Sequence, residues 1–476
     1  METRILSSCV DVPLTGDTLD EIVDKAKDFA LINGVCMHWK QNFDRNRVQI
    51  AKFTLLPTTF PTNEFSKAQD IQFIVNKLIH KVAYDHEFLV EALKSTIETD
   101  ELTSELFKIY KAVYDEGLAQ KISVGLLRSD YILDSDSKIK QVEVNTIASS
   151  FAGLSEVVTQ LHKYILGELG FTDKTVNLPE NHSATGLAEG LVDAWSVYKN
   201  EEAVILFVVE EITYNISDQK ALEIAIRQKN PKIRVIRKSF RYLIDNAQLR
   251  PNKELIVGND LVSVVYYRTG YETSAYPTDK EWEVRLLIER SRAIKCPSIQ
   301  YHLAGTKKVQ QVLSQPGVLR KFLSENEAAK LQDAFVGLYS LDFDKHGEHA
   351  VEMGISSPEK YVLKPQREGG GNNVYGINVK TKLESMRNSK ERIAWILMEL
   401  IRTPLQRNYL ISPDLPRPSL QDFASELGIY GVILGDDNDI KVNRQVGHVI
   451  RTKPFGENEG GIIAGAGALD TPYLQP

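Results

Sequence analysis

Three consecutive glycines lie beside a dense cluster of charge in residues 361–376, which read YVLKPQREGGGNNVYG. A glycine run lets the backbone approach a ligand closely and turn its amides toward an anion. Lys364 could neutralise phosphate oxygens, and Glu368 could hold a magnesium ion against the same oxygens. A loose hairpin connection is the alternative, since glycine runs are common linkers. The charged flanks favour a phosphate-binding loop.

A second group of candidate ligands occurs in the stretch QVEVNTIASSF. Glu143 and Asn145 alternate with two valines, so their oxygens are expected on one face of a strand. The alternative is an ordinary edge strand with a solvated face. Together with Glu368 the two residues supply three oxygen donors, which suits a magnesium ion whose octahedron is completed by phosphates and water.

A third candidate is the C-terminal stretch RTKPFGENEGGIIAGAGALDTPY. Arg451 and Lys453 precede a loop of glycines and small residues, a composition typical of a flap that closes over a ligand. A frayed tail is the alternative. The apolar character of the small residues and the final LDTPYL favour a segment that is tied back into the fold.

The familiar nucleotide signatures are absent. The P-loop motif does not occur, and no GxGxxG opens a helix after a strand, so neither a P-loop nor a dinucleotide-binding fold is indicated. A nucleotide bound by this chain must therefore be held by a different fold.

Helices and strands must position these residues, and their pattern changes along the chain. Helical spacing of apolar residues runs from Leu19 to Leu126, followed by SVGLLRSDYILD and IKQVEVNTIASS, which predict paired strands. Residues 203–304 alternate strands with helices and predict a mainly parallel α/β layer. Residues 383–401 have the pattern of an amphipathic helix, and GDDND supplies the turn of a late hairpin. The fold class expected is α/β (α+β).

The composition is that of an ordinary globular protein with small-molecule partners. The 476 residues suffice for two or three domains, and 42% hydrophobic residues, 25% charged residues and a net charge of -7 indicate neither disorder nor a nucleic-acid surface. Cys9, Cys36 and Cys296 form no CxxC pair and are expected to be buried free thiols. No signal peptide or membrane span is evident, so we expect a cytoplasmic protein with no membrane partner.

Five motifs in sequence resemble those of the eukaryotic glutathione synthetases, members of the ATP-grasp superfamily: EVNTI, AGTKKVQQ, LKPQREGGGNN, ELGIYGV and RTK with its glycine-rich C-terminus. The resemblance covers essentially the whole chain. It implies a ligase that uses ATP and Mg2+ to join γ-glutamylcysteine to glycine through an acyl phosphate, forming glutathione, ADP and phosphate. A homodimer is the family's usual state.

The resemblance also implies an ATP-grasp fold with an inserted substrate-binding domain and a lid. We expect a helix-rich N-terminal part of the core at 1–202, the α/β substrate-binding domain at 203–304 and an ATP-binding part at 305–476. Within the last part, the lid is expected at about 340–420 and the substrate flap at about 454–468.

Individual roles follow from the resemblance, position by position. The magnesium ligands implied are Glu143, Asn145 and Glu368. Arg128 and Arg451 are expected to stabilise the reacting carboxylate and the acyl phosphate, because a guanidinium forks onto paired oxygens; structural ion pairs are the alternative. The ATP contacts implied are Glu143, Lys307, Lys364, Gly369, Gly370, Gly371, Asn373, Tyr375, Met398, Glu399, Ile401, Glu426, Lys453 and Glu459. Substrate contacts are expected from Arg128, Ala148, Ser149, Ser150, Thr213, Asn215, Gln219, Arg268, Tyr271, Arg451, Ile462 and Ile463.

Three positions depart from the family pattern, and all lie among the expected substrate contacts. Ala148 stands where a serine is usual, Thr213 where a glutamate would face the donor's ammonium group, and Ile463 where a small residue is usual. Neutral drift, a ligase with another donor or acceptor, and a non-catalytic nucleotide- or thiol-peptide-binding homologue are the alternatives left open.

Overall fold

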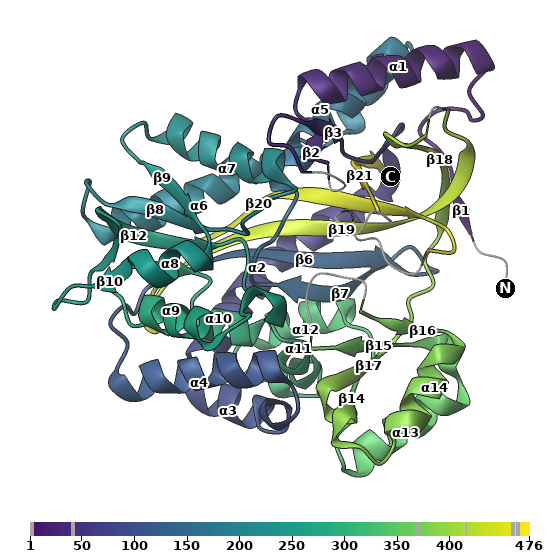
Figure 1. Ribbon diagram of the computed structural model, residues 1–476. Helices are drawn as coiled ribbons and strands as arrows, with labels where there is room; N and C mark the ends of the chain where they lie inside the picture. Colours follow the sequence, from purple (N-terminus) through teal and green to yellow (C-terminus); the bar gives the residue numbers. More distant parts are fainter. Residues whose placement is uncertain (1–3, 40–42, 367–371, 416, 458–461, 463–466) are drawn as a thin grey trace.

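A computed structural model describes residues 4–39, 43–366, 372–415, 417–457, 462 and 467–476. Its largest sheet has eight strands and is mostly antiparallel (Figure 1). In spatial order the strands are β1 (Ile5–Leu6), β18 (Leu405–Ile411), β4 (Phe53–Thr54), β21 (Ala468–Asp470), β20 (Ile440–Pro454), β19 (Leu420–Gly435), β6 (Ser123–Leu133) and β7 (Ile139–Asn145). The expected pairing of residues 123–133 with residues 139–145 is confirmed, as is the hairpin that turns at residues 436–439.

Helices cover both faces of this sheet, because its central strands alternate apolar side chains between two cores. Leu127 of β6 and Ile433 of β19 pack toward α2 (Thr62–Tyr84), whereas Leu126 and Val432 pack toward α5 (Ala152–Glu168) and α6 (Ser183–Tyr198). Strands buried on both faces read as continuous apolar runs, as the segment IYGVIL of β19 does.

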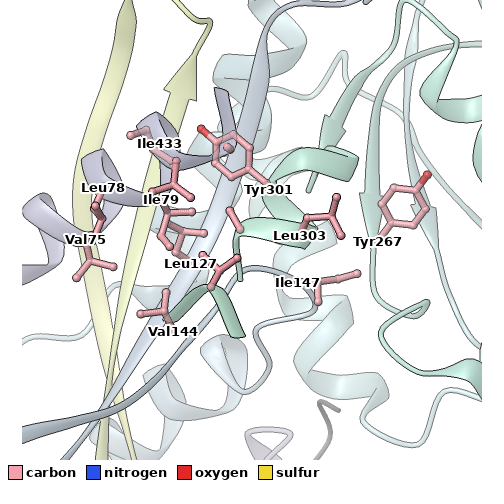
Figure 2. Packing of buried hydrophobic residues seen from close by; sticks show 14 of the residues in the cluster. Val75, Leu78, Ile79, Leu127, Val144, Ile147, Tyr267, Tyr301, Leu303 and Ile433 are labelled. Atoms are coloured by element: carbon pink, nitrogen blue, oxygen red, sulfur yellow. The ribbon is translucent and has the colours of Figure 1, made fainter. Parts of the chain in front are cut away.

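The first core extends along one face of the sheet and includes both α2 and α10 (Ile299–Ala304). Figure 2 shows Val75, Leu78 and Ile79 of α2 on one side of Leu127, with Tyr301 and Leu303 of α10 on the other. Tyr301 is fully buried, and its hydroxyl lies 2.5 Å from His80 Nδ1. This hydrogen bond satisfies the phenol in an apolar surrounding and holds α10 against α2.

A second sheet lies within residues 203–304. Its order is β10 (Ala247–Leu249), β11 (Leu255–Val257), β12 (Asp260–Tyr267), β8 (Val204–Val208) and β9 (Val235–Lys238), with β13 (Ile294–Cys296) also pairing with β12. The pairs β8–β9, β8–β12 and β12–β13 are parallel, and the pairs joining β10, β11 and β12 are antiparallel. The parallel part follows the expectation, and the loops after β8 and β12 leave the sheet at the same edge.

A third, four-stranded sheet forms a separate lobe with α13 (Lys345–Ser356) and α14 (Ile377–Met386) (Figure 1, green). Its order is β14 (Leu338–Ser340), β17 (Trp395–Glu399), β15 (Tyr361–Pro365) and β16 (Val374–Tyr375). Lys308 of α11 (Lys307–Leu313) links this lobe to the rest of the chain through an ion pair with Asp342. Residues 405–411, inside the range expected for the lid, form β18 of the large sheet. The domain boundaries themselves stay predictions.

The prediction of a single amphipathic helix at residues 383–401 is wrong. Helix α14 ends at Met386, a short 3-10 helix covers Lys390–Ala394, and Trp395–Glu399 is β17. Strand β17 is paired on both sides, with β14 and β15, and its central residues are buried. A short apolar run buried on both faces has the same appearance in the sequence as part of a buried helix, which explains the error.

The C-terminus is tied into the fold as expected. Strand β22 (Pro472–Gln475) pairs in parallel with β5 (Thr58–Pro61), and β2 (Cys36–His38) pairs with β3 (Val48–Ile50).

All three cysteines are buried and free. Among the described residues, no helix combines the length and apolar composition needed to cross a membrane. The remaining α-helices are α1 (Gly16–Ile32), α3 (His86–Leu93), α4 (Glu101–Glu116), α7 (Ile216–Lys229), α8 (Phe240–Asn246), α9 (Asp279–Glu289) and α12 (Glu325–Ala334).

Candidate active site

Two expected substrate arginines meet on one face of the large sheet. Arg128 and Asp130 lie two residues apart on β6 and therefore share a face. The Arg128 guanidinium donates to both carboxylate oxygens of Asp130, at 2.6 and 2.8 Å, and Arg451 of β20 donates to Asp130 Oδ2 at 2.8 Å. Arg451 also pairs with Glu426, the residue opposite it on β19. Two cations are thus held in one place by two carboxylates.

Glycine at position 428 makes this crowding possible. A Cβ there would lie 2.8 Å from Arg128 Cδ and 2.9 Å from Asp130 Oδ1, closer than side chains tolerate. The Glu-Leu-Gly order of β19 therefore serves two purposes: it places Glu426 beside Arg451, and it leaves room for the arginine and aspartate next to it.

Opposing charges set the pKa values of the two glutamates. Burial raises the pKa of Glu143, but the nearby cations, Lys307 first among them, outweigh burial and hold it well below the ordinary carboxyl value. The Lys307 ammonium lies 3.1 Å from Glu143 Oε2. Burial raises the pKa of Glu426 above its ordinary value despite the attraction of Arg451. Glu143 is therefore the more firmly ionised of the two.

The strand that carries Glu143 meets both expected ATP lysines. Lys307 is the first residue of α11, and Lys364 of β15 donates to the Val142 carbonyl oxygen at 3.2 Å. A Cβ at Gly305 would lie 2.2 Å from Thr146 Oγ1, so only glycine allows the chain before α11 to approach the end of β7 this closely. The lysines reach one strand from two different lobes of the molecule.

Glu143 and Asn145 fit a magnesium site as far as the described residues extend. Both lie on β7, and Asn145 Nδ2 donates to Glu143 Oε1 at 3.3 Å and to Asp130 Oδ2 at 2.9 Å. These hydrogen bonds involve the amide nitrogen of Asn145 and not its amide oxygen. The ligands offered to a metal ion would be that oxygen and the ionised Glu143 carboxylate, and a hard divalent cation prefers oxygen ligands. The residues that the structure describes contain no cluster of three or more acidic, histidine or cysteine ligands.

The remaining expected ATP contacts lie on the four-stranded sheet and on the long strands of the large sheet. Met398 is buried on β17, and Asn373 Nδ2 donates to the Tyr375 hydroxyl at 3.3 Å. The Glu399 carboxylate accepts from the Gly337 amide and the Tyr339 hydroxyl, both at 3.0 Å, and thus joins β17 to β14. Ile401 is half-buried just beyond β17, and Lys453 is half-buried on β20.

The turn between β7 and α5 brings the expected donor residues together. Ala148 and Phe151 adopt positive φ angles of 50° and 76°, a conformation that side chains disfavour. Asp218 stabilises the turn by accepting from the amides of Phe151 and Gly153, at 2.8 and 2.9 Å. Arg268 donates to the Ser149 carbonyl at 3.1 Å and to Ser150 Oγ at 2.8 Å.

Ser150 connects this turn to the arginine cluster. Its carbonyl oxygen accepts from Arg128 Nη1 at 3.3 Å and from the Tyr430 hydroxyl at 2.6 Å. The expected donor contacts therefore lie directly beside the arginines expected to act on the reacting carboxylate.

A second group of expected donor residues surrounds Arg237 of β9. Arg237 Nη2 donates to Gln219 Oε1 at 2.7 Å and to Thr213 Oγ1 at 3.3 Å, and Gln219 Nε2 donates to Asn215 Oδ1 at 3.0 Å. Burial lowers the pKa of Arg237. Tyr271, on the loop after β12, donates to Glu210 Oε1 at 3.3 Å.

Several expected contacts lie outside the described residues. These are Glu368, Gly369, Gly370, Gly371, Glu459 and Ile463. Ile462 is described and is buried.

Four charged residues of the site were missed in the sequence. Asp130 could have been found, because it alternates with Arg128 on a strand that already carried a candidate. Asp218, Arg237 and Glu210 give no such signal: each reaches the site only through folding of the segment 203–304.

Comparison with known proteins decides the family. The model for the eukaryotic glutathione synthase ATP-binding domain matches residues 16–474. The chain belongs to the eukaryotic glutathione synthetase family. Glutathione synthetase from Rattus norvegicus is 41% identical over 462 residues, which is 96% of this chain and 97% of the rat protein. The Homo sapiens protein of the same name is 40% identical with the same coverage.

A plant relative and a solved structure also align along most of the chain. The chloroplastic glutathione synthetase of Solanum lycopersicum is 39% identical over 430 residues, covering 89% of this chain and 78% of that protein. A solved structure of a glutathione synthetase-like effector from Globodera pallida, in its apo form, matches with a TM-score of 0.78 and 25% identity over 97% of this chain and 98% of the effector. The expected mixed α/β fold of the ATP-grasp type is confirmed, as is the expectation of ATP with Mg2+.

Proposed function

We propose that this chain is an ATP- and magnesium-dependent ligase that joins γ-glutamylcysteine to glycine. The observation that carries the proposal is the cluster of Arg128, Arg451 and Asp130 beside the Glu143–Lys307 pair. The reaction must bring a carboxylate and a triphosphate together, and a site with several fixed cations lowers the cost of doing so. The relatives named glutathione synthetase, matched over nearly the whole chain, support the same reaction.

The chemistry proceeds in two transfers. A carboxylate oxygen of the cysteinyl residue forms a bond to the γ-phosphorus of ATP while the bond to ADP breaks, which gives an acyl phosphate. The glycine amine then attacks the acyl carbon, the C–O bond to phosphate breaks, and the amine loses a proton to solvent. Both steps develop negative charge on oxygen, and water must be excluded between them.

Arg128 and Arg451 are proposed to hold the donor carboxylate and then the acyl phosphate. Their guanidinium groups are already oriented by Asp130 and Glu426, so little reorganisation is needed when the anions arrive. Lys307 and Lys364 are proposed to bind the ATP phosphates.

Glu143, Asn145 and Glu368 are proposed to hold the Mg2+ ion, which when bound neutralises charge on the phosphate oxygens. Because the pKa of Glu143 is held well below the ordinary carboxyl value, its carboxylate is ionised at neutral pH and can bind the ion. Asn373, Tyr375, Met398, Glu399, Ile401, Glu426, Lys453, Glu459 and the glycines 369–371 are proposed as further ATP contacts.

The donor is proposed to bind between the turn at Ser149 and Ser150 and the loops after β8 and β12. Arg268 already bridges these parts. Asn215, Gln219 and Tyr271 are proposed as further donor contacts, with Ile462 and Ile463 near the acceptor. A different acceptor or donor, or loss of catalysis, is an outcome of the test below.

The test is an assay of ADP release coupled to product mass spectrometry, with γ-glutamylcysteine and a panel of amines. We expect ADP release that depends on both γ-glutamylcysteine and glycine, and a product with the mass of glutathione. Release only with other amines would replace glycine as the acceptor. No release above background with any amine would refute the ligase.

Assembly and location complete the proposal. We propose a homodimer, as is usual for the family, which light scattering coupled to size-exclusion chromatography tests by the mass in solution. A cytoplasmic location is proposed as well, and imaging of the protein fused to a fluorescent tag tests it; a plastid or other organelle signal would refute it.

A further inference from the structure

Glu210 is a carboxylate without a cationic partner beside the proposed donor site. It follows β8 by two residues, at the edge where the loops after parallel strands leave the sheet, and it is half-buried. Among the described residues, Glu210 forms no ion pair with a lysine or arginine, and Arg268 acts on it only through longer-range attraction. Its hydrogen bond comes from a neutral group, the Tyr271 hydroxyl, at 3.3 Å.

The cations around Glu210 are committed elsewhere. Arg268 attracts Glu210 electrostatically, but it pairs with Asp218 at 3.5 Å and donates to Ser149 and Ser150. Burial is the main influence on Glu210 and raises its pKa, since the attraction of Arg268 does not make up for the lost water. A half-buried carboxylate in this state gains more from a cationic ligand than a solvated one would.

The Arg237 side of the proposed donor site is unsuited to a cation. The Thr213 hydroxyl and the Gln219 carbonyl oxygen both accept hydrogen bonds from the Arg237 guanidinium. An ammonium group placed beside Thr213 would therefore face a guanidinium and would have to share these acceptors with it. Arg237 already lies 4.0 Å from the Glu223 carboxylate, whereas Glu210 has no such partner, so a positive ligand group is favoured beside Glu210.

We propose that Glu210 binds the α-ammonium group of the donor, and that it is the residue by which this pocket selects a donor with a free amine. This inference rests on the proposed donor class, a γ-glutamyl peptide, and names the contact that reads its amino end. The Tyr271 hydroxyl holds one carboxylate oxygen of Glu210 and leaves the other for the ligand.

The test compares two donors that differ only in this ammonium group. Calorimetry measures binding of γ-glutamylcysteine and of N-glutarylcysteine, which lacks the α-amine, to the full-length protein and to Glu210→Gln. We expect the wild-type protein to bind the amine-bearing donor about 10- to 100-fold more tightly, as a hydrogen-bonded charge pair implies. Glu210→Gln should lose most of that preference and bind N-glutarylcysteine nearly as the wild type does.

Glu211→Gln is the matched control, because Glu211 is the neighbouring carboxylate but is exposed and accepts a hydrogen bond from Ser239 Oγ. It should keep the full preference, and the conservative Glu210→Asp should keep part of it. An equal preference in wild type and Glu210→Gln, or an equal loss in Glu211→Gln, would overturn the inference. Binding is read without turnover, so absence of ADP release in the wild type would count against the ligase and leave this result intact.

Discussion

Replacing Asp130 by asparagine should destabilise the protein by about 3 kcal/mol. Asp130 is fully buried and accepts two hydrogen bonds from Arg128 and one each from Arg451 and Asn145. Removing one partner of a buried ion pair typically costs about 3 to 5 kcal/mol, because the remaining charge is left unpaired. The lower end applies here, since Arg451 keeps Glu426 and the asparagine keeps one acceptor oxygen.

Urea unfolding measured by fluorescence and circular dichroism gives the change in the free energy of unfolding. Glu201→Gln is the matched control: its ion pair with Lys232 has a similar length, 2.9 Å, but both side chains are 70% exposed. An exposed pair is worth less than about 1 kcal/mol. A loss in Asp130→Asn of under about 1 kcal/mol, or one equal to the control, would refute the view that Asp130 organises the two arginines.

Three further changes have defined outcomes. Glu143→Gln should raise the Mg2+ concentration needed for half-maximal turnover at least about tenfold. Because folding lowers the pKa of Glu143 below 4.5, the ionised carboxylate stabilises the wild type above pH 4.5, and this stability is lost on acidification. Urea unfolding at several pH values should show that the variant lacks this pH-dependent stability. His448 is buried, and burial lowers its pKa from 6.5 to about 3, so below pH 6.5 the unfolded chain binds a proton that the folded chain does not. The free energy of unfolding of the wild type should therefore fall by about 2 kcal/mol more between pH 8 and pH 5 than that of His448→Leu, as urea unfolding at the two pH values would measure. An equal fall in the two proteins would contradict this. Asp218 accepts hydrogen bonds from two amides of the turn before α5, so Asp218→Asn should lower the free energy of unfolding by about 1 to 2 kcal/mol and raise the Michaelis constant for the donor. An unaltered Michaelis constant in steady-state assays would show that the turn does not contribute to donor binding.

Features with a short sequence period could be predicted, and features that depend on distant segments could not. Alternation along one strand was enough to group Glu143 with Asn145, and β7 carries both. The position-by-position resemblance to the family was enough to propose Arg128 and Arg451 as candidates. The sharing of Asp130 between those arginines joins residues 321 positions apart, and no local pattern contains that information.

The error at residues 383–401 has a related origin. Periodicity alone could not show that Ile396 and Leu397 pair with strands on both sides, because partners in a sheet are chosen by the fold. Glu210 was missed for the same reason: two adjacent glutamates after a strand look alike until Tyr271 approaches one of them.

The three buried cysteines have a consequence for a protein that handles a thiol. Burial raises the pKa of Cys9 and Cys296 to about 12 and also raises that of Cys36. In thiol–disulfide exchange a cysteine must be ionised and must be able to reach the disulfide that it attacks; these buried side chains with raised pKa values meet neither condition. The proposed donor and product both carry a thiol that can form mixed disulfides. The cysteines of the protein are therefore protected from forming mixed disulfides with the thiol compounds that it would bind and release.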